Sequence, residues 1–369
     1  MTVREMDCQS DRVTITWQDG HRSEYHATWL RDNDPANRDP RTGQRLIDVA
    51  DLPENVTMEG GRYSADGLVH LSWSDRHSSE FHVDWLRAHC PCRGDTEPAA
   101  VTPWDAATPN VLRRFPYAEV LQLHSLRLEW LETIARLGIA FLRDVPMEKD
   151  KVLEVAALVG WVRETNYGRI FDVRAVPDPN NLAYTSLALG LHTDNPYRDP
   201  VPGLQTLHCL RAGGEGGVSL FADGFAVAEA LRSEAPPLFD VLASAAVRFE
   251  FADASTHLCA ERPIIQQSKS ASVEAIAYNS RSIAPLSLAA GEVPEFYRAY
   301  RAFARLLRDE RFVVKTALAE GDLVVFNNRR VLHGRTAFRT TEARWLQGCY
   351  LEQDGLHSQI SVLKRHGPD

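Results

Sequence analysis

The chain has little cysteine, no long apolar run and no excess of basic residues, and each shortage excludes a class of protein. Six cysteines among 369 residues are too few for a disulfide-built scaffold. No stretch approaches the roughly 18 apolar residues that cross a bilayer, and the first ten residues lack the basic and apolar regions of a signal peptide. We therefore expect a reduced, cytoplasmic protein without a membrane span.

Basic residues are outnumbered, because 41 Lys and Arg stand against 50 Asp and Glu and give a net charge of −9. Proteins that bind nucleic acid or an anionic membrane need a basic face, so neither partner is expected. Hydrophobic residues make up 44% of the chain and charged residues 25%. These fractions are typical of a globular protein with a sizeable buried core.

The first 95 residues contain an internal repeat. Residues 17–24 (Trp-Gln-Asp-Gly-His-Arg-Ser-Glu) are echoed by residues 73–80 (Trp-Ser-Asp-Arg-His-Ser-Ser-Glu), and Trp-Leu-Arg follows each copy, at 29–31 and 85–87. The stretch before each copy alternates like a half-buried strand, and the Asp-Gly or Asp-Arg pair suits a hairpin turn. We interpret residues 1–95 as a small β-rich domain of two related hairpins.

The rest of the chain is expected to be a catalytic domain, residues 111–369, joined to the first by a linker at 96–110 that is rich in Pro, Thr, Ala and Asp. Helical spacing of apolar residues predicts helices over 120–137, 149–159, 225–231 and 293–307. From about residue 180 onward, short strands alternate with glycine-marked turns. The pattern predicts a mainly β fold with flanking helices, a double-stranded β-helix (jelly roll).

Two short motifs carry candidate metal ligands. His192 and Asp194 lie two residues apart at the end of a predicted strand, so their side chains point to the same side. His333 follows an apolar strand late in the chain. Two imidazoles and one carboxylate leave positions open for oxygen chemistry, as in Fe(II) oxygenases. A lone His-x-Asp is more often a surface or capping pair, so the hypothesis requires all three residues to meet.

Arg344 strengthens this hypothesis. It lies 11 residues after His333, in the alternating stretch Ala-Arg-Trp-Leu-Gln-Gly. A buried Arg beside the metal would supply the rigid fork that binds a distal carboxylate through two hydrogen bonds. The set of four residues is far more specific than any one of them.

With these residues in place, the chain resembles the Fe(II)/2-oxoglutarate dioxygenases of the taurine-dioxygenase superfamily, and most closely γ-butyrobetaine hydroxylase and trimethyllysine dioxygenase. The motifs that carry the resemblance extend over nearly the whole chain: Trp29-Leu-Arg-Asp-Asn33, Asn180-Asn-Leu-Ala-Tyr184, His192-Thr-Asp194, Gly216-Gly-Val-Ser-Leu-Phe-Ala-Asp-Gly224 and Leu332-His-Gly-Arg335. The family resemblance also suggests a homodimer.

The resemblance implies a cofactor and two co-substrates. Fe(II) would be held by His192, Asp194 and His333, and 2-oxoglutarate and O2 would be consumed as an unactivated C–H bond of the substrate is hydroxylated. The far carboxylate of 2-oxoglutarate would bind Arg344, with Ser219 and Leu207 as further contacts.

Zinc in the N-terminal domain is not expected, although the family usually holds one on three cysteines after Trp-Leu-Arg-Asp-Asn and on a downstream His. The stretch here reads Asp34-Pro-Ala36-Asn-Arg38-Asp39, so the thiolates are absent and only His77 matches. Cys90-Pro-Cys92 follows the second repeat copy and lacks a third cysteine. A structural zinc site needs four ligands.

The resemblance also implies a small zwitterionic substrate. Relatives hold a trimethylammonium group among aromatic rings, whose negative faces attract a cation that donates no hydrogen bond. The matching positions are Tyr167, Phe171 and Tyr184, and a fourth aromatic position, directly after His-Thr-Asp, is Asn195 here. Each aromatic residue alone is more often part of a core, but three at matching positions favour a cage.

The anionic end of that substrate would meet Asn181 and the stretch 278–281. Ser280 stands where the butyrobetaine enzymes tend to have a second Asn, and Arg281 follows it. An Arg and a hydroxyl suit a three-oxygen head such as a phosphonate. The alternative is that Arg281 points to solvent or pairs with a surface acid.

Several functions remain open at this point. We favour hydroxylation of 2-(trimethylammonio)ethylphosphonate at the carbon next to phosphorus, with γ-butyrobetaine hydroxylation to carnitine as the close alternative and trimethyllysine as a weaker one. A non-catalytic cupin-like binding protein is the rival from another class, and the intact set with Arg344 speaks against it. A halogenase of the same fold would lack the carboxylate ligand, and Asp194 is present.

Overall fold

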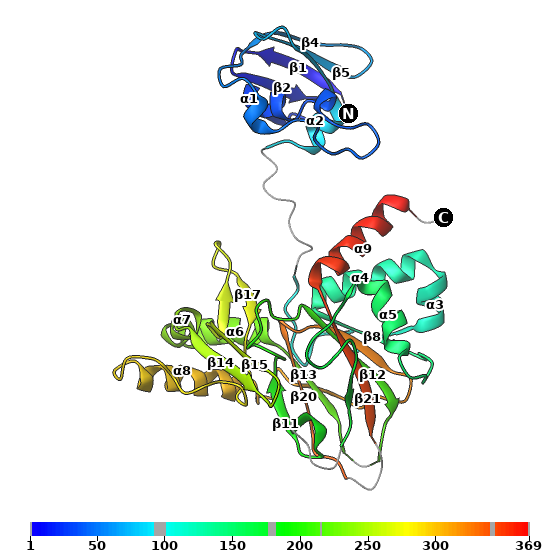
Figure 1. Cartoon of the computed structure of the whole chain (residues 1–369), viewed down its shortest axis with the longest axis vertical. Coiled ribbons are helices and arrows are strands. Elements are labelled where there is room, and N and C mark those ends of the chain that lie inside the picture. The colour runs from blue at the N-terminus through cyan, green and yellow to red at the C-terminus, as the bar shows by residue number, and fades with distance from the viewer. Residues whose placement is uncertain (1, 92–100, 176–181, 215, 340–343, 368–369) are drawn as a thin grey trace. The chain divides into compact units, whose positions relative to one another are not determined.

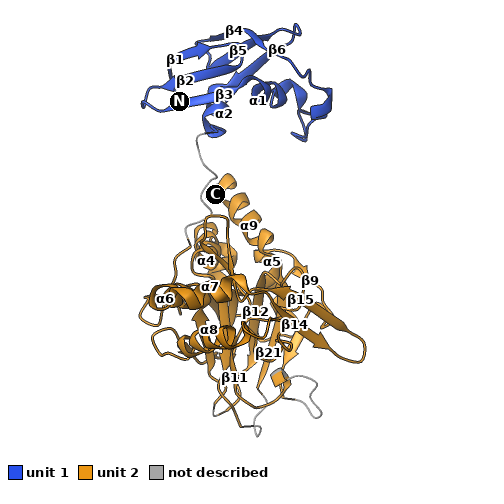
Figure 2. Cartoon of the chain, turned by 90° about the vertical axis from the view of Figure 1, so that its left-hand side faces the viewer, with its two compact units in different colours: residues 1–98 blue, residues 99–369 orange. Residues whose placement is uncertain are grey.

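The computed structural model describes residues 2–91, 101–175, 182–214, 216–339 and 344–367. The chain divides into two compact units, residues 1–98 and 99–369 (Figures 1 and 2), and each is described by itself. Within the described residues, no helix combines the length and the apolar character needed to cross a membrane.

The N-terminal unit consists of two copies of one motif, three antiparallel strands followed by a short helix. The first copy contains β1 (Val3–Cys8), β2 (Arg12–Trp17), β3 (Arg22–His26) and α1 (Ala27–Asp32), and the second contains β4 (Met58–Tyr63), β5 (Leu68–Trp73), β6 (Ser78–His82) and α2 (Val83–Ala88). The predicted hairpins are β2–β3 and β5–β6. Each copy adds a first strand that the repeat pattern did not predict, because β1 and β4 carry no matching sequence.

Polar contacts join the two copies symmetrically. Arg31 of the first helix pairs with Asp75 of the second copy, and Arg87 of the second helix pairs with Asp19 of the first. Asp34, which stands in the stretch where relatives carry zinc-binding cysteines, accepts hydrogen bonds from His77 and from the Ser79 hydroxyl. A shared apolar core that includes both repeat tryptophans joins the two sheets.

Two sheets of the second unit form the jelly roll, so the predicted fold class is confirmed. The seven-stranded sheet has the order β10-β21-β12-β19-β8-β7, and β9 pairs with β21. Its strands are β7 (Arg114–Pro116), β8 (Ile139–Arg143), β9 (Val162–Arg163), β10 (Phe171–Val173), β12 (Leu204–Arg211), β19 (Leu323–Asn327) and β21 (Trp345–Leu351). The four-stranded sheet, in the order β11-β20-β13-β18, contains β11 (Leu189–His192), β13 (Ser219–Asp223), β18 (Val314–Thr316) and β20 (Val331–Arg335). Apolar side chains from both sheets share one core.

One group of helices covers the outer face of the seven-stranded sheet, and a second group packs on the side of the four-stranded sheet (Figure 1). The first group is α3 (Tyr117–Gln122), α4 (His124–Leu137), α5 (Lys151–Val159) and α9 (Gln353–His366). The second group is α6 (Gly224–Glu234), α7 (Pro236–Ser244) and α8 (Val293–Leu306), which pack with the hairpins β14 (Val247–Ala252)–β15 (His257–Arg262) and β16 (Ile265–Gln267)–β17 (Val273–Ile276). All four predicted helical segments are therefore helices over most of their length.

The stretch predicted as a linker, 96–110, is not a simple linker in its second half, because that half is anchored in the core. Its first residues lie outside the described part, but Trp104 is 1% exposed and belongs to the jelly-roll core. Its indole N–H donates to the carbonyl of Leu137, and its backbone N–H donates to Asp223. The composition, rich in Pro, Thr and Asp, predicted a linker and gave no sign that Trp104 is buried.

Candidate metal centre and adjoining cavity

The three predicted metal ligands meet at one place. His192 is the last residue of β11 and His333 is the third of β20, and the antiparallel pairing puts them directly opposite each other. Asp194 follows two residues after His192. One ligand atom from each side chain lies within 4.8 Å of the other two, and the imidazole rings are 4.3 Å apart at their centroids.

The protonation states suit a metal. Burial raises the pKa of Asp194, but its contacts with the imidazoles of His192 and His333 and with the Tyr350 hydroxyl outweigh burial and hold the pKa below its usual value. Burial and the neighbouring His192 lower the pKa of His333 to about 3. At neutral pH the carboxylate is therefore ionised and the His333 imidazole is neutral, which are the forms that bind metal.

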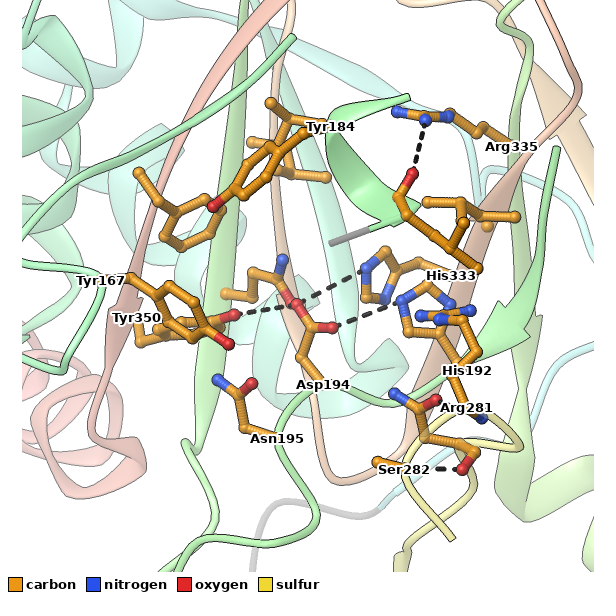
Figure 3. Close-up of a pocket in the computed structure, with 18 of the residues that line it drawn as sticks. Tyr167, Tyr184, His192, Asp194, Asn195, Arg281, Ser282, His333, Arg335 and Tyr350 are labelled. Atoms are coloured by element: carbon orange, nitrogen blue, oxygen red, sulfur yellow. Dashed lines mark hydrogen bonds and ion pairs between the residues drawn. The ribbon is translucent and has the colours of Figure 1, made fainter. Parts of the chain in front are cut away.

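Hydrogen bonds behind the ligands fix their orientation. Nδ1–H of His192 donates to the carbonyl of Gly190 at 2.9 Å, which directs Nε2 toward Asp194 Oδ1, 3.3 Å away, where a metal would bind. Asn328 accepts from the backbone N–H of Asp194 at 2.7 Å and donates to its carbonyl at 2.9 Å. The Tyr350 hydroxyl donates to Asp194 Oδ2 at 2.9 Å (Figure 3). Two imidazoles and a carboxylate held in this way fit Fe(II) with open coordination positions.

The ligands lie in the wall of a cavity of about 440 Å³. Beyond the three ligands, the predicted residues that line it are Arg344, Ser219, Leu207, Tyr167, Phe171, Tyr184, Asn195 and Arg281. Two predicted residues are not among the described lining residues. Asn181 lies outside the described residues, and Ser280 is exposed and is not among the lining residues, since Ser282 takes the place in the wall.

Arg344 fits a bound carboxylate. Its side chain is 6% exposed, and burial lowers its pKa. Among the described residues, no acidic side chain pairs with it. Two glycines make room for it, because a Cβ added at Gly213 or Gly217 would lie 3.0 Å from its side chain. Ser219 and Leu207, on β13 and β12, complete this end of the cavity.

The aromatic wall is built from four segments. Phe171 of β10 lies opposite Gly348, where a Cβ would lie 2.7 Å from its ring, so the glycine lets the ring reach Tyr350 at 4.9 Å between centroids. Tyr167 and Tyr184 line the same cavity. Burial raises the pKa of both phenols, so both stay neutral at physiological pH.

Tyr197 adds an aromatic ring that the motifs did not predict. Its hydroxyl donates to Asn195 Oδ1 at 2.6 Å and lies 3.0 Å from the Tyr167 hydroxyl. Because the amide oxygen can only accept, the Tyr167 hydroxyl must be the donor to Tyr197. Phe251 stacks on Tyr197 at 5.3 Å.

Sequence reasoning also missed Tyr350 and Arg335 as site residues. Tyr350 lies on β21, where every second residue faces the cavity, as Arg344, Leu346 and Tyr350 do. Extending the two-residue period from Arg344 would have found it. Arg335, two residues after His333, follows from the same period on β20.

Two family models match the chain. One, described as the taurine catabolism dioxygenase TauD, TfdA family, matches residues 97–350. The other, described as gamma-butyrobetaine hydroxylase-like, N-terminal, matches twice, at residues 4–62 and 61–103. The double match agrees with the repeated motif of the first unit.

Two relatives and a solved structure are also similar to this chain. The gamma-butyrobetaine dioxygenase of Pseudomonas sp. (strain AK-1) is 37% identical, over 96% of this chain and 94% of its own. The mitochondrial trimethyllysine dioxygenase of Rattus norvegicus is 27% identical, over 97% and 89%. The crystal structure of asparagine oxygenase, 18% identical, covers 62% of this chain and 78% of its own with a TM-score of 0.50, which is a likeness of fold.

Proposed function

Because the chain belongs to the TauD/TfdA family of Fe(II)- and 2-oxoglutarate-dependent dioxygenases, we propose that it hydroxylates a trimethylammonium zwitterion. The observation that carries the proposal is one cavity that joins three metal ligands, an aromatic wall and the guanidinium groups of Arg281 and Arg344. Each group has a chemical counterpart in iron, in 2-oxoglutarate or in the substrate.

The proposed division of roles follows the two ends of the cavity. His192, Asp194 and His333 would hold Fe(II), which supplies the O2 chemistry when bound. Arg344 would bind the far carboxylate of 2-oxoglutarate, with Ser219 beside it. A guanidinium in a buried wall binds a carboxylate through two parallel hydrogen bonds, and this contact sets the co-substrate's direction relative to the metal.

The aromatic wall would bind the quaternary ammonium. Tyr167, Phe171, Tyr184 and Tyr350 line the cavity, and the negative faces of such rings attract a trimethylammonium group, which donates no hydrogen bond. Asn195 lacks the ring that relatives carry at this position, and Tyr197 contributes one two residues later. These rings also exclude water from the carbon that reacts.

Arg281 would bind the anionic end, and γ-butyrobetaine is the first candidate substrate. The preference for a phosphonate depended on a hydroxyl at Ser280, which lies outside the cavity wall. The relative at 37% identity is a gamma-butyrobetaine dioxygenase. The phosphonate remains the second candidate, because Arg281 and the Ser282 hydroxyl together line the cavity and could serve a three-oxygen head.

A side-by-side assay of succinate formation tests the proposal. Purified protein with Fe(II), 2-oxoglutarate and ascorbate is given γ-butyrobetaine, the trimethylammonio-ethylphosphonate or trimethyllysine. We expect at least one of the first two to raise succinate release well above the rate without substrate, with one hydroxylated product per succinate. Succinate release that none of the three compounds increases would contradict the proposal. The homodimer and the cytoplasmic location stay predictions that this assay does not test.

A further inference from the structure

Beside the metal ligands on β11 and β20 lie two further residues that form hydrogen bonds to other parts of the cavity wall. Thr193 lies between His192 and Asp194, and Arg335 lies two residues after His333. Neither was predicted to have a role. Thr193 is fully buried, and Arg335 is 4% exposed.

Thr193 is tied to the segment 278–282. Its backbone N–H donates to the carbonyl of Tyr278 at 2.8 Å, and its hydroxyl accepts from the backbone N–H of Tyr278 at 3.0 Å. The side-chain amide of Asn279 donates to the Thr193 carbonyl at 3.2 Å, and Asn279 Oδ1 accepts from the backbone N–H of Arg281 at 3.1 Å. A short chain of hydrogen bonds therefore connects the residue between two metal ligands to the backbone of Arg281.

Arg335 is tied to the segment 182–187. Its guanidinium donates to the carbonyls of Leu182, Thr185 and Leu187, and Figure 3 draws one of these contacts. These three carbonyls flank Tyr184, a member of the aromatic wall. Because one rigid guanidinium bonds three carbonyls, it fixes the path of the segment as well as its position.

We propose that Thr193 and Arg335 are positioning residues that hold the anion-binding segment and the aromatic segment at set distances from the metal ligands. The inference rests on the proposed function, since it assigns the two ends of the substrate to Arg281 and Tyr184. A zwitterion bound at both ends then presents one carbon to the metal, and the two ties decide which carbon that is. Misplacement of a bound substrate by about 1 Å is enough to reduce turnover strongly.

The first test replaces Thr193 by Val, which keeps the shape and removes the hydroxyl, with Thr193→Ser as the matched control. The Tyr278 N–H then loses its acceptor. We expect the KM for the substrate to rise on the order of tenfold, the KM for 2-oxoglutarate to stay unchanged, and more succinate to form per hydroxylated product. Ser should restore all three values. Equal rises in both KM values, or unchanged coupling of succinate to product, would overturn the role of Thr193.

The second test uses double variants, because a residue that acts through another has no further effect once its target is removed. Arg335→Lys keeps the charge but loses the three-carbonyl contact, and it should raise the substrate KM in the wild-type background but hardly at all in a Tyr184→Ala background. Thr193→Val should likewise lose most of its effect in an Arg281→Ala background. Additive effects in either pair would overturn the proposal.

A structural control and a substrate-independent readout complete the design. Arg330→Lys disturbs another buried Arg, paired with Asp223 away from the cavity, and should lower stability without the substrate-selective rise in KM. Hydrogen exchange measured without substrate should quicken at 278–282 in Thr193→Val and at 182–187 in Arg335→Lys. If wild type hydroxylates none of the zwitterions, the proposed function fails, whereas unchanged exchange in both variants overturns the two ties themselves.

Discussion

Replacement of Arg344 perturbs the co-substrate site most selectively. The side chain is 6% exposed, lies beside Gly213 and Gly217, and has no acidic partner among the described residues. Loss of one partner from a buried, hydrogen-bonded charge pair costs about 2–5 kcal/mol, and 1.4 kcal/mol is a factor of ten. Arg344→Ala should therefore raise the 2-oxoglutarate requirement by roughly 30-fold to several thousandfold.

The assay measures succinate formation against 2-oxoglutarate concentration, with the substrate held at saturation. Arg344→Lys keeps a charge without the fork and should lie between wild type and Ala. Arg298→Ala, on the exposed face of α8, serves as the control for loss of an arginine. A 2-oxoglutarate KM within about threefold of wild type in Arg344→Ala would refute the reasoning, since a desolvated pair is worth more than that.

Three further predictions concern the metal, the aromatic wall and pH. Asp194→Ala should abolish turnover and leave the desalted protein without stoichiometric iron, and iron retained at wild-type level would contradict its role as a ligand. Tyr184→Ala should weaken substrate binding far more than 2-oxoglutarate binding, as the two KM values will report; equal changes would count against the aromatic wall. His208 is fully buried, and burial lowers its pKa from 6.5 to about 4, so only the unfolded chain takes up its proton between those pH values. The free energy of unfolding, measured with denaturant, should therefore fall by up to about 3 kcal/mol from pH 6.5 to pH 4. His208→Gln should reduce this dependence on pH. An unchanged dependence would show that other groups cause it.

Much of the site was accessible from the sequence, because its chemistry is local to short motifs. His192 and Asp194 share one strand end, and the family resemblance linked them to His333, which lies 138 intervening residues after Asp194. The matches to the TauD/TfdA and butyrobetaine families confirm the predicted family, enzyme class and cofactors. The structure places Tyr167, Phe171 and Tyr184 in the wall of one cavity, and their role as a cage stays a prediction.

The rest of the site and fold depends on contacts between distant residues, which no local sequence pattern encodes. Ser280 and Ser282 are equally polar in sequence, and only the turn held by Asn279 decides which one lines the cavity. Tyr197 gains its place by packing against Phe251, a residue of a distant hairpin. Trp104 sits in a stretch whose composition is typical of a linker, yet it anchors that stretch to the core.

The most direct measurement is an anaerobic crystal structure with Fe(II) and 2-oxoglutarate. The account predicts a single ion in direct contact with His192, Asp194 and His333, and a 2-oxoglutarate whose far carboxylate lies on the Arg344 guanidinium. An ion bound without one of these three side chains, or a co-substrate carboxylate paired with another residue, would contradict it.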